Sequence, residues 1–158
     1  MYEKIAQEII ERILKERVRV SMYDESASSV SYAASVEKGL ISKVWDAHFR
    51  FANDNSKERG VVEYLPLEAQ ELIKTYGTDL FILLHEVGHL KTAKGISIKN
   101  KERQEEKLQN YTTAQAVRKA YRNMPVERRA DKWAIQWLIK HPIDARRYQH
   151  MLELGRNS

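Results

Sequence analysis

Residues 2–16 repeat apolar side chains with the period of an α-helix. The apolar positions at this spacing are Ile5, Ala6, Ile9, Ile10, Ile13 and Leu14. Residues three or four apart lie on one side of a helix, so the pattern predicts an amphipathic helix whose apolar stripe packs into a core. The polar face carries both charge signs, which argues against a helix that lies on a membrane surface.

Residues 43–52 alternate apolar and polar side chains, which is the pattern of a half-buried β-strand. The predicted apolar face carries Trp45, Ala47, Phe49 and Phe51. Residues 53–60 predict a turn and residues 61–65 a second strand, so we expect the two strands to form a hairpin. Residues 17–23 also alternate and predict a short strand, unless the first helix continues into them. The small polar residues 24–35 predict a loop.

Proline and glycine mark the next helices. Pro66 opens a predicted helix over residues 66–76, near the position where proline fits a helix best. Gly77 ends this helix, and Thr78 is a candidate N-cap for the following helix, predicted over residues 79–92.

The remaining part of the chain is also predicted to be helical. Residues 99–123 are charged and mostly helical in pattern. Pro125 starts a strong helix that extends to about residue 140, and Pro142 ends it and precedes a last short helix. There is no internal repeat and no sign of a second domain, so we expect one domain over residues 1–158.

Composition narrows the class of protein. The length of 158 residues suits one domain with a real core, and the absence of cysteine excludes disulfides and thiolate metal sites. A chain without cysteine fits the reducing cytosol. The charged N-terminus is not a signal peptide, and the longest apolar run, residues 80–84, is far too short to span a bilayer. We therefore expect a soluble cytoplasmic protein without a membrane partner.

The formal net charge is +5, and the positive excess is localised. Residues 99–132 contain ten Lys or Arg and five acidic residues, so this stretch nets +5 and the rest of the chain nets zero. Such a surface can attract nucleic acid or an acidic partner, although a solvated helix face is the simpler interpretation. We do not expect direct nucleic-acid binding, because acids at 102, 105 and 106 interrupt the basic run.

The stretch "LLHEVGHLKT", residues 83–92, contains the motif His-Glu-x-x-His. On a helix, His85 and His89 project to the same side and can bind one metal ion, for which Zn²⁺ is the usual choice. Glu86 can lie beside a water at the metal without being a ligand itself. The alternative is a chance pair of histidines, but the surrounding residues are largely apolar, and buried polar groups need partners.

A catalytic zinc needs a third protein ligand, and the best candidate is Glu127 in "PVERRADKWA". Glu127 stands at the start of a predicted helix. Asp131 lies on the same face, four residues further on, where it can accept the second ring N–H of a ligating histidine. The alternatives are a glutamate stabilised by the helix dipole and an aspartate in a salt bridge with Arg128 or another basic neighbour.

Peptide hydrolysis passes through an oxyanion, which many zinc proteases stabilise with a Tyr, His or Arg donor. The candidates for this role are His48, Tyr64, Tyr111 and Tyr121. We favour Tyr111 and Tyr121, because they lie between the predicted ligands in the sequence. For each candidate a structural or surface role is the simpler interpretation.

The pair of motifs "HEVGH" and "ERRADKWA" resembles the ImmA/IrrE family of zinc metallopeptidases. The family pattern is His-Glu-x-x-His, then Glu-x-x-Ala-Asn/Asp followed by an aromatic residue and Ala. The resemblance covers about residues 60–140, and Gly88 matches the usual glycine of the first motif. The connector between the motifs is long for this family, so we expect a basic helical insertion at about residues 95–124.

The resemblance implies that His85, His89 and Glu127 bind one zinc ion per chain. It also implies that Glu86 is the general base. The family consists of intracellular proteases, often encoded in mobile elements, that cleave a helix-turn-helix repressor. We therefore expect an α+β zincin-like fold, in which a small antiparallel sheet at about residues 43–65 packs against the helices that carry the motifs.

Two other functions fit the same residues. In a non-catalytic protein the zinc would be structural or vestigial, and the basic surface at residues 99–132 would engage a protein partner or nucleic acid. In a second class of enzyme the same metal site would hydrolyse an amide that is not a peptide.

Overall fold

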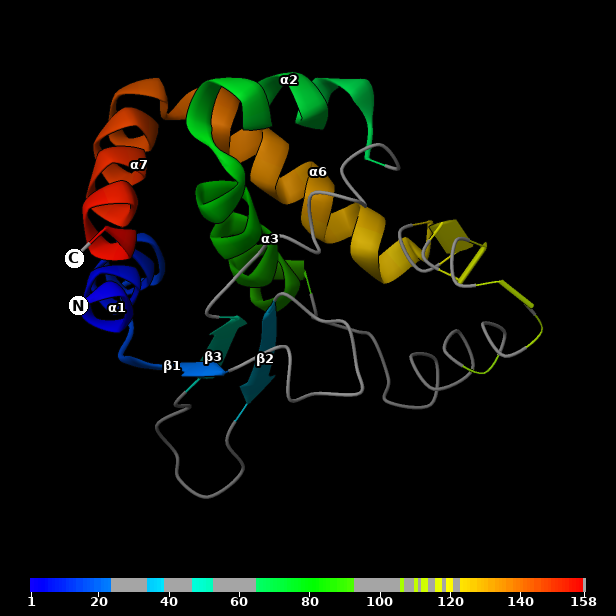
Figure 1. Cartoon of the computed structure of the whole chain (residues 1–158), viewed down its shortest axis with the longest axis horizontal. Helices are drawn as coiled ribbons and strands as arrows, with labels where there is room; N and C mark the ends of the chain where they lie inside the picture. The colour runs from blue at the N-terminus through cyan, green and yellow to red at the C-terminus, as the bar shows by residue number, and fades with distance from the viewer. Residues whose placement is uncertain are drawn as a thin grey trace.

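A computed structural model describes residues 1–23, 34–38, 47–52, 65–92 and 123–157, together with residues 106, 110, 112, 113, 116, 117, 119 and 120. The helices are α1 (Tyr2–Leu14), α2 (Leu67–Tyr76), α3 (Thr78–Thr92), α6 (Pro125–Lys140) and α7 (Pro142–Arg156). The strands are β1 (Val18–Tyr23), β2 (Ala34–Lys38) and β3 (Ala47–Ala52). Figure 1 shows the helices gathered above a small sheet.

The three strands form one mixed sheet in the order β1-β3-β2. The central strand β3 runs parallel to β1 and antiparallel to β2. Phe49 and Phe51 of β3 are buried, as the alternation of residues 43–52 predicts, and their rings stack with centroids 6.4 Å apart. The sheet thus presents an aromatic face to the core.

The sheet corrects two predictions and confirms one. Residues 17–23 were expected to form a strand, and β1 confirms this. Residues 34 and 35 were expected in a loop but begin strand β2, which has few apolar side chains to reveal it.

The predicted antiparallel hairpin between residues 43–52 and 61–65 is wrong for the sheet as described, because both neighbours of β3 are other strands, β1 and β2. Parallel pairing depends on a long connection, which a local pattern does not show. The predicted strand at residues 61–65 lies outside the described residues, except for Leu65, which precedes α2 and is not in a strand.

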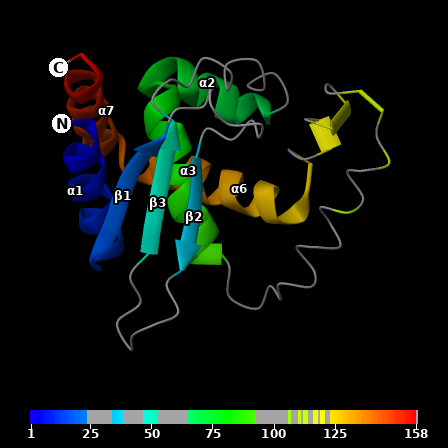
Figure 2. The same ribbon diagram turned by 60° about the horizontal axis from the view of Figure 1, so that its bottom comes forward.

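Helix α3 is the centre of the molecule. From Leu80 to Val87, apolar residues occupy nearly every side of this helix. Its buried apolar residues are Leu80, Phe81, Leu83, Leu84 and Val87. A helix that is apolar on every side is buried on every side. Accordingly, α3 packs against α6 on one side and against β2 on another, and it also contacts α1, α2 and α7 (Figure 2).

Most helix boundaries follow the predictions closely, but α7 has 15 residues and begins at Pro142 itself, so it is not the short helix expected after that proline. Helix α1 ends at Leu14, and α6 starts at Pro125 as expected. Pro66 lies just before α2 rather than in it, because its backbone is extended. Gly77 has φ 88° and ends α2, and its carbonyl also accepts a hydrogen bond from the Phe81 N–H. Helix α3 therefore begins at Thr78 itself, which corrects the prediction of Thr78 as its N-cap.

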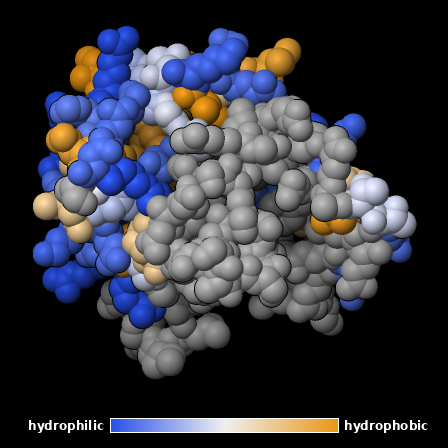
Figure 3. All heavy atoms as spheres, in the orientation of Figure 1, coloured by the Kyte–Doolittle hydropathy of each residue, from blue (hydrophilic) through white to orange (hydrophobic). Residues whose placement is uncertain are grey.

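Helices α1 and α7 lie side by side, with hydrophilic side chains and single apolar ones on their outer surfaces (Figures 1 and 3). Arg156 of α7 donates hydrogen bonds of 3.2 Å to both carboxylate oxygens of Asp79 on α3. The same guanidinium lies 3.9 Å from the ring centroid of Tyr2 on α1. Burial raises the pKa of Tyr2 above its usual value. These three side chains join three helices at one point.

None of the helices in the described parts of the chain is both long enough and apolar enough to cross a bilayer.

Candidate metal centre

Two helices meet closely enough to share a polar site. Gly88 of α3 lies against the backbone of Ala130 on α6, and a Cβ atom at Gly88 would come within 2.8 Å of the Ala130 carbonyl oxygen. Since real Cβ atoms are not found so close to a backbone oxygen, this crossing needs glycine at position 88. Gly88 of the first motif and Ala130 of the second thus let α3 and α6 approach closely. The histidines of the first motif and the carboxylates of the second meet beside this contact.

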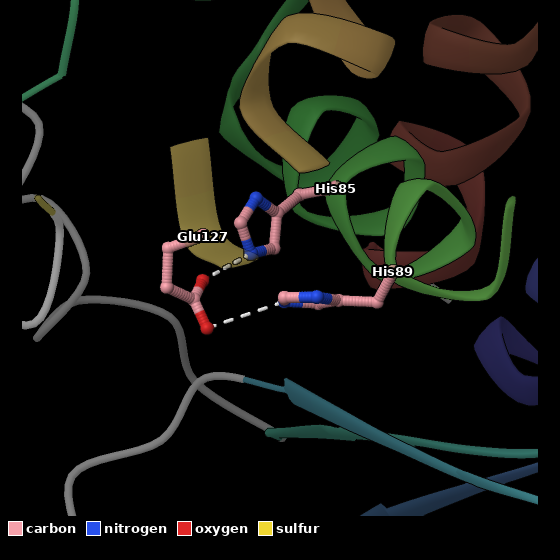
Figure 4. A group of neighbouring side chains, drawn as sticks. All are labelled: His85, His89 and Glu127. Carbon is pink, nitrogen blue, oxygen red and sulfur yellow. Dashed lines mark hydrogen bonds and ion pairs between the residues drawn. The ribbon is translucent and has the colours of Figure 1, made fainter. Parts of the chain in front are cut away.

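The side chains of His85, His89 and Glu127 point toward one another (Figure 4). The Nε2 atom of His85 lies 2.7 Å from Oε2 of Glu127, and Nε2 of His89 lies 3.3 Å from Oε1 of the same carboxylate. The two imidazole rings are nearly perpendicular, with an interplanar angle of 87° and centroids 4.6 Å apart. All three ligand atoms lie within 4.8 Å of one another, so this group could hold a metal ion.

Asp131 lies on the other side of His85. Its Oδ1 is 2.6 Å from Nδ1 of His85, and its side chain is 3% exposed. In the tautomer with the proton on Nδ1, Asp131 accepts that proton and Nε2 of His85 is directed at the shared site. This is the contact that the spacing of Glu127 and Asp131 predicts, rather than a salt bridge with Arg128.

His85 therefore faces a carboxylate with each ring nitrogen. A neutral imidazole has only one N–H, so it can donate to only one of the two carboxylates. The remaining contact would bring a nitrogen lone pair against a carboxylate oxygen, which is repulsive without a cation between them. Either an additional proton or a metal ion has to supply that positive charge.

Glu127 is charged in this environment. Burial by itself would raise the pKa of its carboxyl group, but hydrogen bonds and charge interactions with His85 and then His89 hold that pKa well below its usual value. An ionised carboxylate and two imidazoles form a donor set of one oxygen and two nitrogens.

This donor set fits zinc. Catalytic zinc sites use three protein ligands, and two histidines with one glutamate are a common combination. Zinc bonds of about 2.0–2.2 Å place tetrahedral donor atoms roughly 3.3 Å apart. The 3.3 Å separation of His89 and Glu127 matches that spacing, whereas the 2.7 Å separation of His85 and Glu127 is that of a direct hydrogen bond and would have to widen around the ion.

The centre is buried on one side and more open on the other. The side chains of His85 and Glu127 are 8% and 5% exposed, whereas that of His89 is 18% exposed. Of the three side chains, that of His89 is therefore the most accessible to solvent. Glu86, the residue after His85, is also buried at 7% exposure. A buried glutamate at this position is a candidate proton acceptor close to the centre.

The other predicted residues are not brought to the centre by the described parts of the structure. Tyr64, Tyr111 and Tyr121 lie outside the described residues, and of His48 only the backbone, in β3, is described. His141 is an exposed residue that follows α6 and makes a 2.9 Å contact with the carbonyl oxygen of Trp137.

One contributor was missed at the level of sequence. Ala130 was noted only as part of the second motif, yet its backbone is what Gly88 packs against. The signal was present, since a glycine in one motif and an alanine in the other are the small residues that a close helix crossing needs. The spacing of residues within each motif does not show that Gly88 and Ala130 face each other across the two helices.

No protein-family model matches the chain, and neither a curated protein nor a solved structure is detectably similar to it.

Proposed function

We propose that the protein is a zinc-dependent peptidase whose metal ligands are His85, His89 and Glu127. The observation that carries this proposal is the meeting of His85, His89 and Glu127, whose ligand atoms all lie within 4.8 Å of one another. The resemblance of the two motifs to the ImmA/IrrE metallopeptidases supports peptide hydrolysis and a zincin-like fold. By the same resemblance, the proposed substrate is a helix-turn-helix transcriptional repressor.

Each residue has a separate role in the proposed reaction. Zinc, when bound, would supply a Lewis acid that polarises a carbonyl and makes a water nucleophilic near neutral pH. Glu86 accepts the proton of the attacking water and passes it to the leaving amine. Asp131 keeps His85 in the tautomer that offers Nε2 to the metal.

The position of the sheet suggests how a substrate is held. In the described sheet, β2 is an edge strand, and it contacts α3, which carries the two histidines. An extended peptide can add to such an edge through backbone hydrogen bonds. A peptide bound there would run past the more open, His89 side of the centre.

The proposal is tested with the Glu86→Gln variant, which preserves shape but cannot act as a base. Zinc content should stay at about one ion per chain, while cleavage of a repressor substrate should fall by at least about a hundredfold. Glu68→Gln, an exposed change on α2, is the matched control and should cleave as wild type. Wild-type cleavage by Glu86→Gln would disprove the assigned mechanism.

The same experiment separates the competing functions. A non-catalytic zinc protein would bind the metal but would cleave no peptide, whether position 86 is Glu or Gln. An amide hydrolase of another kind would lose a non-peptide activity in the Glu86→Gln variant. The basic surface at residues 99–132 bears on the first alternative, and of its cations the structure describes only Lys119, Arg128, Arg129 and Lys132.

A further inference from the structure

Helix α6 separates its charges onto opposite sides. Both of its acids, Glu127 and Asp131, are buried against α3 in the metal centre. The residues that it exposes on the opposite side, here called the α6 outer face, are Arg128, Arg129, Lys132, Gln136, Ile139 and Lys140. These positions fall within one third of the helix circumference, and no acidic residue is among them. All charges on the outer face are therefore positive.

Among the described residues, no carboxylate neutralises the lysines and Arg129 of this face. In the described parts of the structure no carboxylate lies within ion-pair distance of Arg129, Lys132 or Lys140. Arg128 donates a hydrogen bond to the neutral side chain of Asn123. The face extends over about 18 Å, since a helix rises 1.5 Å per residue. A surface of this size can receive a segment of a partner.

The arrangement is unfavourable for the isolated helix. Arg128 and Arg129 lie near the N-terminus of α6, where the helix dipole disfavours positive charge. Arg128 and Lys132 are four residues apart, and like charges at that spacing repel. Helix stability therefore does not account for these residues, whereas a bound anionic group would relieve both effects.

Apolar side chains lie beside the cations where α6 passes into α7. Ile139 is 55% exposed and Ile143 is 77% exposed. In the chain they flank Lys140, and the exposed Arg146 and Arg147 follow on α7, where Arg147 lies 3.9 Å from Asp144. A surface of cations and exposed aliphatic groups is complementary to a partner that has both acidic and apolar side chains.

We propose that the α6 outer face, together with Ile143, is a docking surface for an acidic protein segment that carries apolar side chains. A nucleic-acid backbone matches the cations but has no group that would bury the two isoleucines. The surface lies on the back of the helix that supplies Glu127, so a docked partner would be fixed to the same rigid element as the metal centre. The proposal does not depend on the proposed peptidase activity.

The test measures the fluorescence anisotropy of three labelled probes at physiological ionic strength, where charges more than about 8 Å apart are largely screened. The first is a peptide of Leu-Glu-Glu-Glu repeats, the second has Ser in place of each Leu, and the third is a DNA duplex of similar charge. The leucine peptide should bind with a dissociation constant about tenfold lower than either of the others. In the variant Ile139→Ser with Ile143→Ser, the leucine peptide should bind no more tightly than the serine peptide.

The decisive variant is the triple reversal Arg129→Glu, Lys132→Glu and Lys140→Glu, which should weaken binding of the leucine peptide by about tenfold or more. The matched control reverses three cations exposed elsewhere, Lys4, Arg17 and Lys74, and changes the net charge equally. It should bind the peptide within about twofold of wild type.

Three outcomes would overturn the proposal. An equal loss in the control triple would mean that only net charge matters. Tighter binding of the duplex, lost in the α6 triple, would make the face a nucleic-acid site. Wild-type binding by the α6 triple would remove the face from recognition. Circular dichroism and zinc content report whether each variant is folded, and the pair Arg129→Gln and Lys132→Gln replaces the triple if it does not fold.

Discussion

At the scale of single residues, the candidate centre depends on the two contacts of His85. Its Nδ1 is 2.6 Å from Asp131 and its Nε2 is 2.7 Å from Glu127. The first contact orients the ring, and the second joins it to another candidate ligand. In the proposed metal site Asp131 is thus a positioning residue, which would act on the ion through the histidine rather than by direct contact.

The role of Asp131 predicts a graded effect on metal affinity. Asp131→Asn can still accept the Nδ1 proton but loses the negative charge, whereas Asp131→Ala loses both. We expect zinc to bind about tenfold more weakly in the first variant and up to about a hundredfold more weakly in the second. Competition with a chromogenic chelator measures these affinities.

The control for this series is Asp144→Asn on α7, which lies away from the centre and should bind zinc as wild type. Equal zinc affinity in Asp131→Ala and wild type would show that Asp131 does not support His85 in the metal-bound protein.

At the scale of helices and strands, the centre depends on how closely α3 and α6 cross. The crossing is set by Gly88, since any side chain there would meet the backbone of Ala130. The same crossing determines the distance between His85 and Glu127, which come from different helices. Packing and metal binding are therefore coupled through a residue that has no ligand atom.

This coupling predicts that Gly88→Ala loses stability and zinc affinity together. The added methyl group would push the helices apart, and overpacking of this kind costs roughly 1–3 kcal/mol of unfolding free energy. Zinc should bind at least about tenfold more weakly, because the ligands of the two helices would separate. Urea unfolding and chelator competition measure the two effects.

Gly77→Ala is the matched control for this change. At Gly77 a Cβ atom meets nothing closer than 3.9 Å, but φ is 88°, a conformation that strains alanine. This variant should lose about 1–2 kcal/mol of stability while its zinc affinity stays as in wild type. If both variants lost zinc affinity equally, general destabilisation would explain the result and the coupling would be wrong.

At the scale of the whole molecule, the cluster of Tyr2, Arg156 and Asp79 joins α1, α7 and α3. The side chains of Arg156 and Asp79 are each only 23% exposed, so their ion pair is partly shielded from solvent. The cluster thereby links the helices at the two ends of the described chain to the helix that carries His85 and His89.

A double-mutant cycle tests the contribution of this ion pair. Arg156→Met and Asp79→Asn should each lower the unfolding free energy by about 1–3 kcal/mol, because each leaves a partly buried charge without its partner. The double variant should lose clearly less than the sum of the two, with a coupling energy of at least about 0.5 kcal/mol. Urea titration of the four proteins provides these values.

The pair Arg147 and Asp144 on α7 is the matched control, because its atoms are 3.9 Å apart and its side chains are 59% and 43% exposed. Its cycle should show no measurable coupling. Additive losses for Arg156 and Asp79 would mean that their contact does not stabilise the molecule.

The sequence by itself predicted most of the helices and the group of side chains that meets at the candidate centre. Their signals are local, since the apolar period, Pro125 and Gly77 act within a few residues, and residues four apart on one helix must share a face. Asp131 and Glu127 could be assigned for the same reason. Only the tertiary structure decided that Gly88 meets Ala130, that β3 pairs with β1 and β2, and that α6 turns its acids inward and its cations outward. These features join residues that are distant in the chain, so they depend on the packing of whole elements, which a local pattern does not contain.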